Sequence, residues 1–266
     1  MQERHHNKQQ YFREQARTTD QYVIPFIEEV RPVRAGMRVL EIGCGEAGNL
    51  KPFLERGCHC VGVDLSPHRI ALAKSFFEGH PQRAHLKLYA EDIYKAKPLL
   101  SEPYDLLIMR DVIEHIPDQE RFMAYVKAFL QPDGLFFLGF PPWYMPFGGH
   151  QQICAHRILS KLPYYHLLPN PLYRQLLRWG GEPESRIAEL MDIKATGISI
   201  DRFLRIVRRE GYRIARQQAY LIQPNYETKF GLKPRRQSPL IEALPGLRNV
   251  VTSALYIVLQ PPAIRC

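Results

Sequence analysis

The chain has 266 residues, of which 45% are hydrophobic and 24% are charged, and its formal net charge is +9 at pH 7. It contains no internal repeat, and its length suits one globular domain with an elaboration. It has no run of eighteen apolar residues and it starts with polar residues, which predicts neither a membrane-spanning helix nor a signal peptide. The five cysteines lack zinc-ribbon spacing, so we expect reduced thiols and a cytoplasmic protein.

The charge is distributed unevenly along the chain. Residues 1–140 contain 18 Lys and Arg against 19 Asp and Glu, whereas residues 141–266 contain 18 against 8. Such asymmetry suggests an anionic substrate, a nucleic acid or a membrane face, and an ordinary solvated helix face is equally compatible. The arginines that raise this question are Arg202, Arg205, Arg208, Arg209, Arg213 and Arg216.

Residues 1–35 are predicted to be helical and to carry an apolar stripe. The stripe consists of Tyr11, Phe12, Tyr22, Val23 and Phe26. A stripe at helical spacing is more often core packing than a lid over a ligand, so core packing is the preferred interpretation. The alternative is that Tyr11, Phe12 and Tyr22 close over a bound ligand.

Residues 37–48 combine an apolar strand with a glycine-rich turn, Gly43-x-Gly45-x-x-Gly48. Glycines in such a turn let the backbone approach a nucleotide at a helix N-terminus. Glu41 at the strand end and Glu46 in the loop would repel a pyrophosphate. A nucleoside ligand with cationic groups, such as S-adenosylmethionine, suits these acids better than NAD.

The following segments predict further parallel strands that end in acids. Residues 60–64 form a β-branched run that ends at Asp64, nineteen residues after Gly45, where an acid can accept both ribose hydroxyls. Ser66 and Pro67 then begin a helix. Residues 86–90 form a third strand, and the acids after it are suited to an adenine amino group.

Two more strands and a turn complete this part of the chain. The fourth strand is predicted at residues 104–110 and leads into Asp111, Glu114 and His115 at the start of a helix. Asp133 and Gly134 predict a turn before a fifth strand at residues 135–140. A final helix and an antiparallel pair of strands are expected between residues 200 and 260.

These segments in this order resemble the class I S-adenosylmethionine-dependent methyltransferases of the small-molecule type, similar to the ubiquinone-biosynthesis O-methyltransferases. The matching stretches are VLEIGCGEAG, VGVDLSP, AEDI, YDLLIMRDVIEHIPD and DGLFFLGFPP, within residues 37–142. Ala47 departs from the family pattern, in which many relatives have glycine. The resemblance implies a doubly wound α/β fold with a seven-stranded, mostly parallel Rossmann-like sheet, and S-adenosylmethionine as the cofactor.

The expected organisation has four parts. Residues 1–35 form the helical segment that precedes the core, and residues 36–142 form the cofactor-binding core. Residues 143–200, rich in proline and aromatic residues, form a helical cap inserted between strands five and six, because an unstructured loop of that length is unusual. Residues 201–266 supply the closing helix and strands.

Candidate site residues gather where the parallel strands end. The cofactor-binding candidates are Glu41, Gly43, Cys44, Gly45, Asn49, Asp64, Leu65, Glu91, Asp92, Ile93, Arg110 and Asp111. The substrate candidates are Trp143, Tyr144, Phe147 and His150, in the segment that follows strand five.

His115 and His150 are the candidates for a catalytic base, because an imidazole titrates near the working pH and a hydroxyl acceptor must lose its proton. Packing on the cofactor is the alternative role for His115. Glu114 and His115 could join a metal site, but the sequence spacing offers no further ligand, and no metal is expected.

The expected function is methyl transfer to a hydroxyl of a small or amphipathic metabolite, and three other functions compete with it. An RNA methyltransferase would explain the basic second half, although the chain has no recognisable RNA-binding module. A NAD-dependent oxidoreductase is disfavoured by Glu41 and Glu46. A non-catalytic binding module is disfavoured because the cofactor-facing residues are intact.

Overall fold

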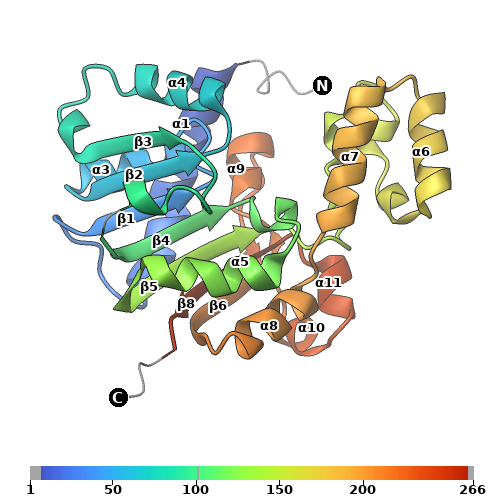
Figure 1. Cartoon of the computed structure of the whole chain (residues 1–266). Helices are drawn as coiled ribbons and strands as arrows, with labels where there is room; N and C mark the ends of the chain where they lie inside the picture. The colour runs from blue at the N-terminus through green and yellow to red at the C-terminus, as the bar shows by residue number, and fades with distance from the viewer. Residues whose placement is uncertain (1–6, 101, 263–266) are drawn as a thin grey trace.

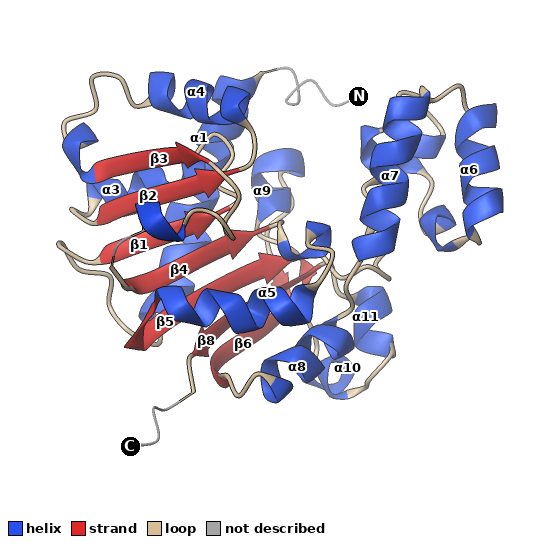
Figure 2. Ribbon diagram, viewed as in Figure 1, coloured by secondary structure: helices blue, strands red, loops and turns tan. Residues whose placement is uncertain are grey.

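The computed structural model describes residues 7–100 and 102–262, in which eight strands form a single sheet. Helices cover both faces of the sheet (Figures 1 and 2). The strands are β1 (Arg38–Ile42), β2 (His59–Asp64), β3 (Leu86–Ala90), β4 (Tyr104–Arg110), β5 (Leu130–Phe140), β6 (Arg213–Ile222), β7 (Arg235–Arg236) and β8 (Ala254–Gln260).

Helices connect most of these strands, and short 3₁₀ turns occupy several of the loops. The α-helices are α1 (Lys8–Thr18), α2 (Ile24–Glu28), α3 (Lys51–Glu55), α4 (Pro67–Phe76), α5 (Gln119–Val126), α6 (Asn170–Trp179), α7 (Glu184–Thr196), α8 (Ile200–Arg209), α9 (Asn225–Phe230), α10 (Pro239–Ala243) and α11 (Leu247–Val251). A π-helical turn at Thr19–Val23 joins α1 to α2.

The strand order is β3-β2-β1-β4-β5-β8-β6-β7. Strands β1 to β5 pair in parallel, and β8 runs antiparallel between β5 and β6. The predicted count of seven strands is wrong, because β7 pairs with the edge of β6 as an eighth strand. A two-residue strand is too short to show the alternating pattern by which strands are recognised in a sequence.

The turn predicted at Asp133 and Gly134 is also corrected by the structure. These residues lie inside β5, where the pairing register with β4 shifts. Leu130 pairs with Tyr104 and Leu135 pairs with Leu106, so β5 has more residues than β4 between these two pairs. The extra residues, which include Asp133 and Gly134, form a bulge-like irregularity within the strand.

Two large apolar clusters fill the two faces of the sheet. One contains Phe122 of α5 and Phe203 of α8, and the other contains Phe53 of α3 and Ile70 of α4. Strands β1 and β4 are buried on both faces, as expected of parallel strands covered by helices. Local signals support the connecting helices: the Ser66 hydroxyl accepts a hydrogen bond from the Arg69 N–H at 3.3 Å and begins α4.

Helices α6 and α7 follow β5 and project beyond the carboxyl ends of the parallel strands (Figure 1). They pack on a third, smaller apolar cluster of their own, in which Tyr173, Leu177 and Leu190 are fully buried. This segment therefore has its own packing and stands beside the edge of the sheet where parallel strands end. Within the described residues, no helix combines the length and the apolar character needed to cross a bilayer.

The N-terminal helices pack against the sheet rather than standing apart. Phe12 of α1 is 6% exposed, and its ring centroid lies 5.0 Å from that of Phe76 and 5.4 Å from that of Phe77. Tyr11, its neighbour, lines two cavities at the carboxyl edge of the sheet. Phe12, Val23 and Phe26 of the predicted stripe thus lie in the core, whereas Tyr11 faces the candidate site.

A buried guanidinium, that of Arg110 at the end of β4, ties the carboxyl ends of the strands together. Its Nη1 donates to Asn49 Oδ1 at 2.7 Å and its Nη2 donates to Asn225 Oδ1 at 2.5 Å. Asn49 in turn donates from Nδ2 to Glu41 Oε1 at 2.6 Å. The Thr19 hydroxyl joins the network through Asn49 Oδ1 at 2.9 Å and Arg110 Nη1 at 3.1 Å.

The ionised form of Glu41 is unfavourable in this network. Burial raises its pKa to about 8, although Asn49 and Arg110 oppose the rise, and its Oε2 atom has no hydrogen-bond partner. When a carboxyl has a higher pKa in the folded than in the unfolded protein, its protonated form stabilises the fold. This contribution is complete below the pKa of the unfolded state, near 4.5, and is lost as the pH rises through the pKa of the folded state, about 8.

We therefore expect the wild-type protein to lose melting temperature relative to Glu41→Gln between about pH 5 and pH 8, since the amide never ionises. A difference of about 1 kcal/mol corresponds to about 2–4 °C for a chain of this size, and we expect at least that gap at pH 8. Thermal unfolding across this pH range measures it. Glu55→Gln, which removes a partly exposed carboxylate paired with Lys51, is the control. Parallel curves for wild type and Glu41→Gln would contradict the assignment.

Candidate active site

The functional candidates lie at one edge of the sheet because parallel strands end together. β1, β2, β4 and β5 run in one direction, and β6 shares it because both β5 and β6 are antiparallel to β8. At their carboxyl ends lie the loop after β1, Asp64 as the last residue of β2, Asp111 directly after β4, and the segment after β5. Ligands in open α/β sheets bind beyond this edge.

A cavity of about 400 Å³ opens beside β1, β2 and the loop after β4. Its walls combine aliphatic side chains with four carboxylates, those of Asp64, Glu91, Asp92 and Asp118. Such a lining is suited to a nucleoside, whose base is flat and whose sugar carries hydroxyls. The lining residues include five of the predicted cofactor residues besides Gly43: Asp64, Leu65, Glu91, Asp92 and Ile93. Leu65 is 74% exposed, so its side chain is available to a ligand.

The Asp64 carboxylate is held in place by backbone donors. Its Oδ2 accepts from the Gly45 N–H at 2.8 Å, and its Oδ1 accepts from the Ser66 N–H at 2.9 Å. Each carboxylate oxygen can accept a second hydrogen bond. Asp64 is therefore a fixed, partly satisfied acceptor at the tip of β2, as a ribose diol requires.

The glycine loop differs from expectation at Glu46 and Cys44. Glu46 is buried and ion-paired with Arg69 at 2.9 Å and with Lys8 at 3.2 Å, and these cations lower its pKa against the effect of burial. Its charge is neutralised within the protein, so it does not repel an anionic ligand as predicted. The Cys44 thiol is buried against Gly62 rather than in the nucleoside cavity.

Gly43 and Gly45 are needed in this loop for two reasons. Both adopt positive φ, +71° and +55°. In addition, a Cβ on Gly43 would lie 2.6 Å from a methyl of Val112, and a Cβ on Gly45 would lie 2.4 Å from the Arg69 guanidinium. The loop after β1 therefore packs directly against the loop after β4, which fixes one wall of the nucleoside cavity.

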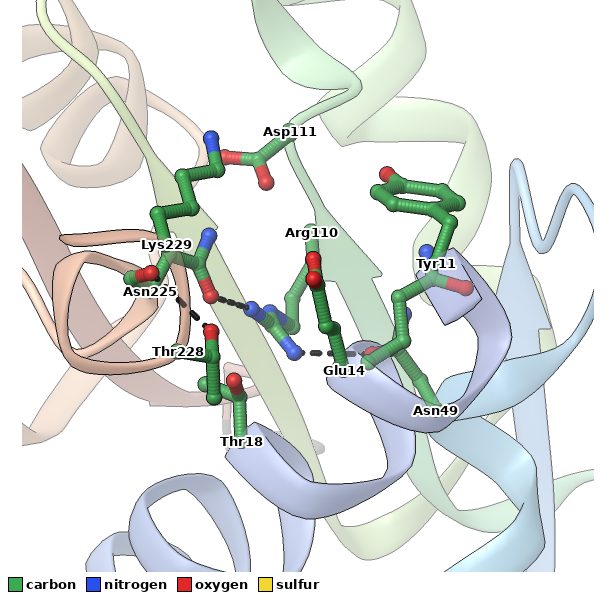
Figure 3. A pocket seen from close by; sticks show the side chains of 10 residues that line it. Tyr11, Glu14, Thr18, Asn49, Arg110, Asp111, Asn225, Thr228 and Lys229 are labelled. Carbon is green, nitrogen blue, oxygen red and sulfur yellow. Dashed lines mark hydrogen bonds between the residues drawn. The ribbon is translucent and has the colours of Figure 1, made fainter. Parts of the chain in front are cut away.

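A small polar cavity, about 40 Å³, surrounds Arg110. Figure 3 shows the Arg110 guanidinium between Asn49 and Asn225, with Tyr11 and Lys229 at its sides. Glu41, Asn49 and Arg110, predicted to touch the cofactor, are thus mainly bonded to one another. Asn49 and Arg110 still line this cavity. Glu41 lines neither this cavity nor the nucleoside cavity.

A larger cavity of about 180 Å³ adjoins the polar one and shares Tyr11, Asp111, Asn225 and Lys229 with it. Apolar walls come from the segment after β5 and from α9, and include Met145, Phe147 and Phe230. His150 lines this cavity too, so two of the four predicted substrate residues reach it. The shared end carries the Lys229 ammonium together with the Asp111 carboxylate, so it is polar and holds both signs of charge. A cavity with apolar walls and such an end fits a small metabolite with an apolar and a polar part.

Trp143 and Tyr144 do not join the other substrate candidates. The Trp143 ring packs edge-on against His166, with centroids 4.7 Å apart, and lies over Gly197, where a Cβ would come within 2.5 Å of the indole. Tyr144 is 44% exposed. Both residues lie in the segment after β5, but Trp143 supports this segment instead of lining a cavity.

Two residues of the acceptor cavity hold strained backbone conformations. Asp111 has φ +54° and His150 has φ +55°, in the left-handed region that non-glycine residues avoid. Each such residue costs about 1–3 kcal/mol, and such strain is found mainly at functional sites. Only two other described non-glycine residues, Ala47 and Tyr164, have positive φ.

His115 and His150 face each other, with ring centroids 5.1 Å apart and an interplanar angle of 78°. His115 lines the nucleoside cavity and His150 lines the acceptor cavity. His115 lies in a 3₁₀ turn, Ile113–His115, and not at the start of the following α-helix, because Asp118 caps α5. Burial lowers the pKa of both imidazoles, that of His150 to about 3, so both are neutral at pH 7.

Several lining residues were not anticipated from the sequence. α9 supplies Asn225, Tyr226 and Lys229, and the segment after β3 supplies Tyr94. The direction of β6 places α9 here: α9 follows the end of β6, and β6 runs in the same direction as β5 because both are antiparallel to β8. The nucleoside cavity also includes Pro117 and Arg121.

Comparison with known proteins identifies the family. A sequence model described as a methyltransferase domain matches residues 12–162, more than half of the chain. The ubiquinone biosynthesis O-methyltransferase of Nitrobacter winogradskyi is 34% identical over 101 residues, 38% of this chain and 37% of that protein. Its namesake in Mesorhizobium japonicum is 31% identical over 122 residues, 45% and 47% of the two chains. The matched region thus spans less than half the length of these relatives.

Solved structures share the fold at low sequence identity. Geranyl diphosphate C-methyltransferase from Streptomyces coelicolor A3(2) superposes with a TM-score of 0.53 at 12% identity, over 88% of this chain and 77% of that one. PKMT2 from Rickettsia typhi superposes with a TM-score of 0.56 at 14% identity, over 93% and 54%. The chain belongs to the methyltransferase-domain family, with the α/β Rossmann-like fold of the class I methyltransferases, for which S-adenosylmethionine is the cofactor.

Proposed function

We propose that this protein transfers a methyl group from S-adenosylmethionine to a hydroxyl oxygen of a small or amphipathic metabolite. The observation that carries the proposal is the meeting of two cavities at one pair of imidazoles. His115 lines the nucleoside cavity, His150 lines the acceptor cavity, and the ring centroids are 5.1 Å apart. The similar proteins named ubiquinone biosynthesis O-methyltransferases support oxygen as the acceptor atom.

The residues present fit the adenosyl part of this cofactor. The fixed Asp64 carboxylate would accept hydrogen bonds from the ribose hydroxyls, and Leu65 and Ile93 offer apolar surface to the base. Glu91 and Asp92 would accept from the adenine amino group. When bound, the cofactor supplies an electrophilic methyl group on a positively charged sulfur.

The acceptor cavity would orient the nucleophile. Phe147, Met145 and Phe230 would hold an apolar body, while Lys229 and Asp111 at the far end would bind a polar substituent. Alignment is the main contribution expected of the protein, because well-oriented reactants can gain up to about 7–11 kcal/mol in ideal intramolecular cases.

The overall reaction is a displacement. An electron pair of the acceptor oxygen forms the new oxygen–carbon bond, the carbon–sulfur bond breaks, and its electrons stay on sulfur, which becomes neutral. The hydroxyl proton leaves to solvent. His115 and His150 are neutral and so able to accept it, although a pKa of about 3 makes His150 a weak base.

An RNA acceptor is the second candidate, favoured by the basic second half of the chain. The arginines around α8 give it limited support, because several are engaged within the protein. Arg209 pairs with Glu120 at 2.9 Å, Arg216 pairs with Glu29, and Arg208 donates to the Leu204 carbonyl at 3.1 Å. A solvated, ion-paired surface accounts for this part of the charge.

A NAD-dependent oxidoreductase remains the weaker alternative. Glu46 no longer argues against it, because Arg69 and Lys8 neutralise that carboxylate. The antiparallel β8, inserted between β5 and β6, and the match to the methyltransferase-domain family argue for the methyl donor instead.

Calorimetric titration with S-adenosylhomocysteine should show micromolar binding, and titration with NADH should show none. Asp64→Ala should weaken that binding between about ten- and a hundredfold, since hydrogen bonds to a charged group contribute about 1.5–3 kcal/mol. Asp133→Ala, which removes an exposed carboxylate paired with Arg31, should bind like wild type. Binding of NADH, or unchanged affinity in folded Asp64→Ala, would refute this placement of the cofactor.

Incubation with methyl-labelled S-adenosylmethionine should label hydroxylated aromatic and carboxylated metabolites in preference to bulk RNA, because the acceptor cavity has a volume of only about 180 Å³. Mass spectrometry of the product should place the methyl group on oxygen. Labelling of RNA in preference to every small molecule tested would support the second candidate and overturn the first.

A further inference from the structure

Three atoms that can bind a metal, one carboxylate oxygen and two imidazole nitrogens, converge between the two cavities. Glu114 Oε1 lies 4.0 Å from His115 Nε2 and 3.7 Å from His150 Nε2. All three ligand atoms lie within 4.8 Å of one another. The sequence could not show this convergence, because Glu114 and His115 are adjacent whereas His150 lies in the segment after β5.

The Glu114 carboxylate is buried and has no hydrogen-bond partner on either oxygen. Its side chain is 3% exposed, and both Oε1 and Oε2 are unsatisfied among the described residues. Leaving such a group unpaired costs about 1–3 kcal/mol or more. A separation of 3.7 Å from the nearest imidazole nitrogen is too long for a hydrogen bond, so proton sharing with His150 does not explain the arrangement.

The surrounding structure holds His150 in this position. Its backbone has φ +55°, and the preceding Gly149 packs so closely that a Cβ would lie 2.3 Å from His166. His166 in turn bonds Gln151 at 3.2 Å and the Trp143 carbonyl at 2.8 Å. On the other side, the Thr196 hydroxyl of α7 donates to the Glu114 carbonyl at 2.6 Å. Packing of the segment after β5 therefore fixes His150, and the hydrogen bond from α7 fixes the backbone of Glu114, so that the two residues lie close together.

We propose that Glu114, His115 and His150 bind a divalent transition-metal ion at the junction of the donor and acceptor cavities. A ligand set of two imidazoles and one carboxylate suits Zn²⁺, Co²⁺ or Mn²⁺, whereas Mg²⁺ and Ca²⁺ prefer oxygen ligands throughout. Bonds of about 2.1 Å place the ligand atoms of a tetrahedral site roughly 3.4 Å apart. The two separations from Glu114 Oε1, 3.7 and 4.0 Å, are close to that value, and the two imidazoles, within 4.8 Å of each other, must move closer on binding.

Three protein ligands leave at least one coordination position open, as in catalytic metal sites. That position lies beside the acceptor cavity, which His150 lines. There the ion would bind the acceptor oxygen, lower its pKa and release its proton to solvent, the step for which the two neutral imidazoles are weak bases. Only this catalytic role rests on the proposed function; the metal site rests on the side chains themselves.

The first test measures metal binding without any substrate. Untagged full-length protein is stripped with a chelator and titrated with Zn²⁺ by calorimetry and with Co²⁺ by visible absorption. We expect one ion per chain and Co²⁺ ligand-field bands with nitrogen ligation. Glu114→Gln and His150→Ala should each weaken Zn²⁺ binding at least tenfold.

Two controls isolate the cluster. Glu91→Gln removes a carboxylate that lines the nucleoside cavity outside the cluster, and replacing His5 and His6 with alanine removes adjacent histidines near the chain start. Both variants should keep wild-type Zn²⁺ affinity. Melting temperatures establish that each variant is folded, and His115→Ala serves as a third test if Glu114→Gln is not.

Two results would overturn the proposal. One is Zn²⁺ affinity that is unchanged in the folded Glu114→Gln, His150→Ala and His115→Ala variants, and the other is tighter binding of Mg²⁺ than of Zn²⁺. Titration of the metal-free protein with S-adenosylhomocysteine separates the two proposals. If this ligand binds without metal, the cofactor assignment is supported and the metal site is judged by the Zn²⁺ titration alone. If it does not bind while Zn²⁺ does, the cofactor assignment is refuted and the metal site is supported.

Discussion

A buried cation at the end of β4 organises the functional edge of this protein. The Arg110 guanidinium bonds Asn49 of the loop after β1, Thr19 of the N-terminal segment and Asn225 of α9. Removing a cation from water is costly unless every donor finds a partner, so these bonds must form together. Segments more than a hundred residues apart in the sequence are thereby held at the same corner, beside both cavities.

The same edge stores strain where the two cavities meet. Asp111 and His150 occupy left-handed backbone conformations, and Glu114 is buried without a hydrogen-bond partner. The sheet and the packed helices α6 and α7 can hold such residues because their cores are complete without them. Unfavourable local geometry that persists in a well-packed protein points to chemistry at that place.

Sequence patterns predicted the parallel core well, because buried strands, helix caps and strand-end acids are local features. β4 matches its predicted bounds, and five predicted residues with Gly43 line the nucleoside cavity. The patterns did less well where a residue's role depends on a distant partner. The sequence predicts that Glu46 repels a phosphate, yet Arg69 and Lys8 neutralise this carboxylate in the structure. Trp143, a predicted substrate residue, supports a loop instead of lining a cavity.

The sequence by itself determined the family, the direction of the strands and the edge at which the ligand site forms, because periodicity and strand-end residues encode these within a few positions. Only the tertiary structure decided which side chains meet there. It placed α9 beside α1 through the direction of β6, and it brought His150 within 3.7 Å of Glu114. Contacts between distant segments follow from how the helices pack on the sheet, which no local pattern specifies.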